Sequence, residues 1–74
     1  MTDATDSQAR AEAILGELAE LGLMLARDLA AQARACEDPA DTERLVTAFN
    51  KTSRAVRLTL ALEAKLRRDR ARDA

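Results

Sequence analysis

The stretch Cys36-Glu37-Asp38-Pro39-Ala40-Asp41 interrupts a chain of 74 residues that is otherwise rich in helix-forming residues. Proline disfavours helical geometry in the residue before it, so a helix that precedes Pro39 should end by residue 36 or 37. The same stretch can start a second helix. Asp38 suits the N-cap, Pro39 suits the first helical position, and the charge of Asp41 suits the positive end of the helix dipole. The stretch therefore predicts a tight turn between two helices.

Both sides of this turn have the composition of long helices. Alanine, leucine, arginine, glutamate and aspartate dominate, and the chain has one aromatic residue and one proline. We expect helices over residues 6–36 and 39–68, with Thr5 as the first N-cap. Two helices of similar length joined by a short turn form an all-α antiparallel hairpin. The chain then divides into a disordered N-terminus, a helical hairpin and a fraying charged tail, over residues 1–5, 6–68 and 69–74.

Each predicted helix has more apolar surface than one neighbour can cover. The first helix has a leucine stripe at the 3-4 spacing of a coiled coil, and beside it a line of small residues that would let another helix approach closely. On the second helix the apolar sector spans about 200°, wider than the ~100° stripe that suits a small core. We expect the core and oligomer interface to contain Leu18, Leu21, Leu25, Leu29, Leu45, Phe49, Val56 and Leu60.

Self-association is the expected way to cover this excess. A chain this short has marginal stability unless disulfides, a metal or oligomerisation assist it. It contains a single cysteine, Cys36, and no histidine. We therefore predict a homo-oligomer, by default a four-helix bundle of two hairpins, with a larger ring or a hetero-complex as alternatives.

Charge is divided unevenly along the chain. Residues 1–43 have a net charge of −7 and residues 44–74 have a net charge of +6. This division favours packing the two helices side by side and provides a basic second helix for anionic partners.

Catalysis finds little support in the sequence. Histidine, tyrosine, tryptophan and a glycine-rich phosphate loop are all missing, and Ser7, Ser53 and Cys36 have no evident base beside them. We predict a chain that is not an enzyme and has no cofactor, metal or small-molecule substrate. Glu12, Glu17 and Glu20 are interpreted as a solvated face. The sequence has no apolar run long enough to span a membrane, and a cytoplasmic location is expected.

The basic residues of the second half are the candidate binding residues. Lys51, Arg54 and Arg57 recur every three residues in a segment without an acid, which is typical of a phosphate-binding ridge. An alternative is that they pair with acids of the first helix or are only solvated. The candidates for binding nucleic acid or an acidic partner are Arg44, Lys51, Arg54, Arg57, Arg67 and Arg68.

The segment Asp38-Pro39-Ala40-Asp41-Thr42-Glu43-Arg44-Leu45, together with Ser53-Arg54-Ala55-Val56-Arg57-Leu58-Thr59-Leu60-Ala61-Leu62-Glu63, resembles Ala/Arg-rich helical proteins of α-proteobacteria. Within that group it is similar to the helical oligomerisation region of small terminase subunits of gene transfer agents and phages. This resemblance implies a ring-forming hairpin whose partners are DNA and the large terminase motor subunit. Many small terminases have a helix-turn-helix before this region, and this chain has no room for one, which argues against sequence-specific DNA recognition.

These observations lead to three functional hypotheses. The first is a non-catalytic oligomerisation or adaptor module of DNA packaging that binds nucleic acid non-specifically through the second helix. The second is a regulatory RNA-binding protein that forms a four-helix bundle. The third is a small chaperone or anti-regulator whose apolar stripes receive a helix of a partner protein.

Overall fold

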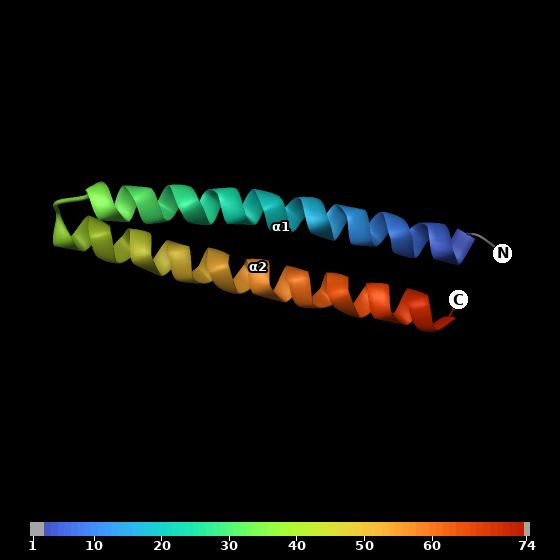
Figure 1. The fold of residues 1–74 in the computed structure, drawn as a ribbon. Helices are drawn as coiled ribbons and strands as arrows, with labels where there is room; N and C mark the ends of the chain where they lie inside the picture. The colour runs from blue at the N-terminus through green and yellow to red at the C-terminus, as the bar shows by residue number, and fades with distance from the viewer. Residues whose placement is uncertain (1–2, 74) are drawn as a thin grey trace.

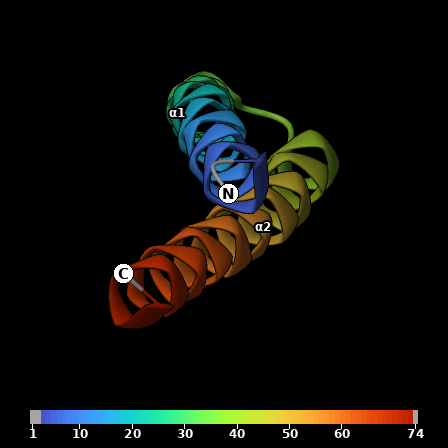
Figure 2. The ribbon, with the colours of Figure 1, turned by 90° about the vertical axis from the view of Figure 1, so that its right-hand side faces the viewer.

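The computed structural model describes the backbone of residues 3–73 and the side chains of residues 6–73. It confirms the all-α antiparallel hairpin. Helix α1 spans Asp3–Ala35 and helix α2 spans Pro39–Asp73 (Figure 1). Viewed from its open end, the hairpin shows α2 crossing α1 at an angle (Figure 2). Neither helix of the described part is long and apolar enough to cross a membrane.

The turn forms as the sequence predicts. The Asp38 carboxylate accepts a hydrogen bond from the backbone N–H of Ala40 at 2.9 Å, which is the N-cap interaction. The carbonyl oxygen of Asp38 accepts from the backbone N–H of Thr42 at 2.9 Å and from the Thr42 hydroxyl at 3.1 Å. Cys36 is half-buried beside the turn, with Sγ 3.5 Å from the same carbonyl oxygen. These bonds start α2 at Pro39, and three residues separate it from the end of α1 at Ala35.

Replacing Asp38 with alanine should therefore weaken the hairpin. The Ala40 N–H would lose its acceptor, and loss of an N-cap costs about 1 kcal/mol. In a chain of this size that lowers the thermal midpoint by roughly 4–8 °C. Circular dichroism melts at one fixed chain concentration measure the change. Asp38→Asn, which keeps a capping oxygen, should melt close to the wild type, and equal losses in both variants would show that the cap is not responsible.

The ends of the helices differ from the predicted bounds. Helix α1 begins at Asp3, so Thr5 lies inside the first turn and is not the N-cap. Residues 3–5 of the predicted disordered N-terminus are helical, and residues 1–2 lie outside the described part. Helix α2 continues to Asp73, beyond the predicted end at residue 68, and Ala74 lies outside the described part. The physical reason for the longer α2 is an ion pair that joins its last turns to α1, described below.

The two helices pack through small residues of α1. Ala19 and Ala26 are the buried apolar residues of the described part, each 6% exposed. Between them Gly22 lies so close to α2 that a Cβ atom there would be 2.6 Å from Cγ2 of Val56. Between Ala19 and Ala26 the line that faces α2 therefore consists of alanine and glycine, because only small side chains permit this approach.

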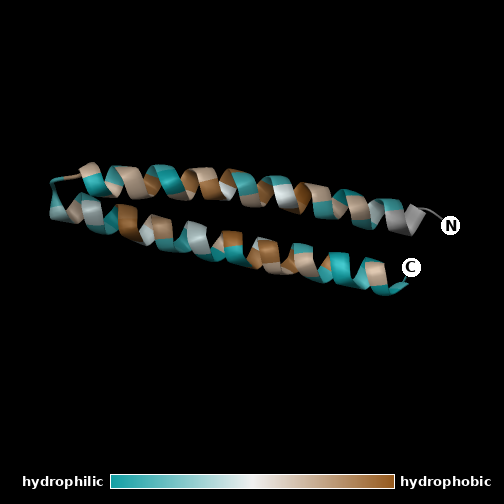
Figure 3. Cartoon of the chain, viewed as in Figure 1, coloured by the Kyte–Doolittle hydropathy of each residue, from teal (hydrophilic) through white to brown (hydrophobic). Residues whose placement is uncertain are grey.

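The leucine stripe of α1 lies beside this seam and not within it. Leu18, Leu21 and Leu25 are 52%, 62% and 51% exposed, and Leu60 of α2 is 48% exposed. Leu29, Leu45, Phe49 and Val56 are partly covered between the helices. Figure 3 shows apolar residues distributed around the middle of both helices. Within one hairpin the core is thus not the predicted leucine stripe, and the role of these leucines in contacts between copies stays a prediction.

Candidate functional site

The hairpin has two candidate interaction surfaces and one interhelical ion-pair cluster. The first surface lies on the side of α2 turned away from α1. Leu45, Thr52, Val56 and Glu63 mark the side that meets α1, so residues a third to a half of a turn away from them point sideways or outward at 100° per residue. We call the exposed outward bases the outer ridge: Lys51, Arg54, Arg57, Lys65 and Arg68.

The outer ridge has no carboxylate among its members. Glu63 is the single acid between residues 50 and 68, and it lies against Gly16 of α1 instead of facing outward. None of the five ridge bases has an ion-pair partner among the side chains of residues 6–73. The alternative in which Lys51, Arg54 and Arg57 pair with acids of α1 therefore does not occur in this part of the chain. Their charges are fully available to solvent or to an anionic ligand.

The other predicted binding residues lie in different surroundings. Arg44 is 3.6 Å from the Asp41 carboxylate in an exposed pair. Arg67 donates to Glu63 at 3.1 Å and lies 3.9 Å from Glu12. Nearby carboxylates partly neutralise the charges of Arg44 and Arg67, so we do not include these two residues in the outer ridge.

The second surface is an apolar face that both helices form along one side of the hairpin. A groove lined by Leu18, Gly22, Leu25, Thr52, Ala55, Val56 and Thr59 joins the two helices on this side. The helical repeat adds neighbouring residues to it. We call this surface the leucine face: Ile14, Leu18, Leu21, Leu25, Ala55, Leu58 and Leu62. Its leucines and isoleucine are between 48% and 65% exposed, and because they lie together they form a contiguous apolar patch of the kind that marks an interaction site.

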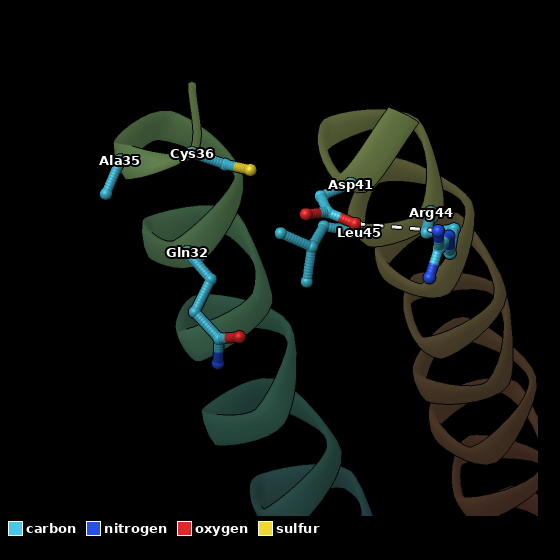
Figure 4. A pocket seen from close by; sticks show the side chains of 6 residues that line it. All are labelled: Gln32, Ala35, Cys36, Asp41, Arg44 and Leu45. Atoms are coloured by element: carbon cyan, nitrogen blue, oxygen red, sulfur yellow. Dashed lines mark ion pairs between the residues drawn. The ribbon is translucent and has the colours of Figure 1, made fainter. Parts of the chain in front are cut away.

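A shallow pocket lies near the turn at the end of the same side. Its lining comes from the last turn of α1, the connecting turn and the first turns of α2 (Figure 4), namely Gln32, Ala35, Cys36, Asp41, Arg44 and Leu45. The Asp41–Arg44 ion pair occupies one wall, and the Cys36 thiol points toward α2. Among the described residues no group of three histidine, cysteine, aspartate or glutamate side chains is placed to hold a metal ion.

At the open end of the hairpin, Glu12 and Arg70 form the interhelical ion pair. Arg70 Nε donates to Glu12 Oε2 at 2.6 Å, and Arg70 Nη2 donates to Glu12 Oε1 at 2.9 Å. Glu12 is 7% exposed, so its interpretation as part of a solvated face is wrong. The bidentate geometry holds the last turns of α2 against α1, which explains why α2 extends beyond residue 68.

Hydrogen bonding to Arg70 lowers the pKa of Glu12 below its usual value of 4.5. Partial burial opposes this effect, and the positive charges of Arg70 and Arg67 add to it. The same hydrogen bonds raise the pKa of Arg70, so the pair is fully ionised at neutral pH. Arg70 was not among the predicted site residues. One sequence signal could have found this pair: counting similar numbers of residues along each helix away from the turn places residue 12 near residues 67–70.

Known proteins do not identify this arrangement. Comparison with protein-family models, curated proteins and solved structures finds no significant match.

Proposed function

We propose that the chain is a non-catalytic, self-associating adaptor that holds nucleic acid by its phosphate backbone along the outer ridge of α2. The supporting observation is the absence of any carboxylate partner for Lys51, Arg54, Arg57, Lys65 and Arg68 within the described side chains. These bases extend from residue 51 to residue 68, which is about 25 Å of helix at 1.5 Å per residue. A row of that length spans several phosphates of a duplex strand.

Binding by such a ridge is electrostatic and independent of sequence. The ridge has no aromatic side chain for base stacking, because the single aromatic residue, Phe49, lies partly covered on another side of α2. Each phosphate neutralised releases counterions, so affinity falls steeply as salt concentration rises. Such contacts give dissociation constants of about 1–100 µM at physiological salt. A component of DNA packaging, as the small-terminase resemblance implies, is the biological role that this property suits best.

Replacing Arg54, Arg57 and Arg68 together with glutamine should weaken duplex DNA binding and flatten its salt dependence. Each lost phosphate contact reduces the slope of log K against log salt concentration by about 0.9, so the triple variant should lose about 2 to 3 in slope. Fluorescence anisotropy with a labelled duplex, measured over a salt series, gives both quantities.

The matched control is the triple variant of α1, in which Arg10, Arg27 and Arg34 become glutamine. These three bases are also exposed, and the variant has the same change in net charge. It should keep most of the affinity and the slope. Equal losses in the two variants would show that general charge, and not the outer ridge, attracts DNA.

The choice of nucleic acid separates the packaging role from the regulatory RNA hypothesis. Duplex DNA and a structured RNA hairpin of similar length are compared at the same ionic strength. Stronger binding to duplex DNA supports the packaging role, and a clear preference for the RNA hairpin favours the regulatory one. If neither binds above background in low salt, the proposal is wrong and the hypothesis of a protein partner remains.

A further inference from the structure

The leucine face has the dimensions and chemistry of an interface. Between Cα atoms the hairpin measures 57 by 14 by 11 Å. One long side of such a body has roughly the 800 Å² per partner of a standard stable interface. Six large aliphatic side chains, Ile14, Leu18, Leu21, Leu25, Leu58 and Leu62, are half exposed on that side. They occupy the middle of the hairpin, as the apolar centre of an interface does.

The register of the hairpin places residues of α1 and α2 from this face at the same positions along the long axis of the hairpin. Gly16 lies against Glu63 and Gly22 lies against Val56, so one step forward along α1 corresponds to one step back along α2. By this counting Leu21 is level with Leu58. Leu18 is level with residue 61, next to Leu62.

The same counting aligns opposite charges at the rim of the face. Asp28 of α1 is level with Lys51 of α2, and Glu17 is within one turn of the level of Lys65. Neither acid has an ion-pair partner among the described side chains. Both lie on the outer flank of the leucine stripe, where a helix stacked on α1 would meet them.

A two-fold axis parallel to the helices leaves the position of each residue along the helix axis unchanged. It stacks α1 of one copy on α2 of the other. It therefore brings Leu21 level with Leu58 of the second copy and Asp28 level with Lys51 of the second copy. It also places the acidic half of one chain against the basic half of the other, since residues 1–43 have net charge −7 and residues 44–74 have +6. A two-fold axis perpendicular to the helices stacks α1 on α1 and α2 on α2, which juxtaposes like charges.

We propose that a second copy of the chain covers the leucine face through a two-fold axis parallel to the helices, so that α1 of each copy lies on α2 of the other. The result is a four-helix bundle in which both turns lie at the same end and neighbouring helices are antiparallel. This inference rests on the self-association in the proposed function and specifies its geometry. In this bundle Lys51 and Lys65 lie at the rim of the interface, whereas Arg54, Arg57 and Arg68 of the outer ridge stay outside it and remain available to phosphates.

Cys36 allows the geometry to be measured in the unmodified sequence, because it is the single cysteine and lies at the turn. A nitroxide label on Cys36 and pulsed electron spin resonance give the distance between the two labels of a dimer. With both turns at one end, the labels are separated by no more than two interaxial distances plus their linkers, below about 30 Å. With turns at opposite ends, the separation is about the 50 Å length of α1.

Light scattering on the labelled and unlabelled chain at about 100 µM accompanies this measurement, and we expect the mass of a dimer for both. A dimer with a distance near 50 Å overturns the proposed geometry but leaves self-association and DNA binding intact. A monomer overturns both the geometry and the self-associating part of the proposed function. A larger ring overturns the two-fold bundle alone.

Leu21→Asp tests the face itself. Leu21 is 62% exposed, so the substitution leaves the contacts between α1 and α2 within one copy unchanged, and we expect the dimer mass to fall to that of a monomer. The matched control is Leu23→Asp, which places the same charge on the opposite side of the hairpin, where Leu23 lines a groove with Gly16 and Leu60. This control should stay a dimer. If Leu21→Asp also stays a dimer, or if both variants dissociate equally, the leucine face is not the interface.

Discussion

Gly22→Ala should destabilise the hairpin by as much as about 2 kcal/mol, although alanine is the better helix former. Replacing glycine with alanine inside a helix stabilises it by about 1 kcal/mol when the new methyl group has room. At position 22 that methyl group would lie 2.6 Å from Cγ2 of Val56, a stiff β-branched side chain close to the α2 backbone. Overpacking of this kind costs about 1–3 kcal/mol and outweighs the gain. The thermal midpoint should fall by several degrees.

Gly16→Ala is the matched control for this prediction. There the added Cβ would lie 3.2 Å from Oε2 of Glu63, the far end of a flexible side chain that can move aside. The substitution should therefore stabilise the hairpin by about 1 kcal/mol. In a Val56→Ala background Gly22→Ala should also become stabilising, because the obstructing methyl groups are gone. Equilibrium unfolding of the four combinations at one chain concentration measures the coupling. Gly22→Ala and Gly16→Ala changing stability in the same direction would contradict the close approach at Gly22.

Glu12→Gln should lower the thermal midpoint and remove much of the acid sensitivity of the hairpin. The substitution takes the negative charge from a nearly buried position where Arg70 donates two hydrogen bonds. In the folded chain the pKa of Glu12 is lowered, so the ion pair adds stability above the unfolded value near 4.5. That stability is lost as the pH falls through the lower folded pKa. The wild type should therefore melt at progressively lower temperature below about pH 4.5, and the variant should show a smaller decline.

Circular dichroism melts between pH 2 and pH 7 test this prediction, with Glu17→Gln as the control. Glu17 is exposed and has no ion-pair partner among the described side chains, so its variant should keep the acid sensitivity of the wild type. Arg70→Gln should resemble Glu12→Gln, and the double variant should be less destabilised than the two single effects added together. Strict additivity would mean that Glu12 and Arg70 do not act as a pair in solution.

The turn and the two helices could be predicted because the signals are local. Asp38 and Pro39 determine the cap and the break through their own backbone preferences, and Asp38 accepts the predicted bond from Ala40. The identity of the packed stripe is not a local property. The leucine stripe and the small-residue line of α1 have the same 3-4 spacing, and hydrophobicity favours the leucines. The stripe that packs against α2 contains Ala19, Gly22 and Ala26, because only small residues allow the two helices to come this close. How close they come depends on the position of Val56 on α2.

The candidate site was predictable to a similar extent. The acid-free segment around Lys51, Arg54 and Arg57 is visible in the sequence, and the structure adds that these bases have no carboxylate partner in the described part. The pairing of Glu12 with Arg70 depends on the length of the turn and on the rotation of both helices about their axes. Neither quantity follows from periodicity alone. The sequence therefore does not distinguish Glu12 from the exposed acids Glu17 and Glu20.

The three-residue turn also has a consequence for the order in which the chain folds. Contacts next to the turn join residues that are close in sequence, whereas the Glu12–Arg70 pair joins residues 58 positions apart. The entropy lost on closing a loop increases with its length, so closing the ends first is the most costly route. Once the residues nearest the turn have met, each further contact closes only a small additional loop. We expect the hairpin to form progressively from Asp38 outward, with the ion pair at the open end forming last and opening first.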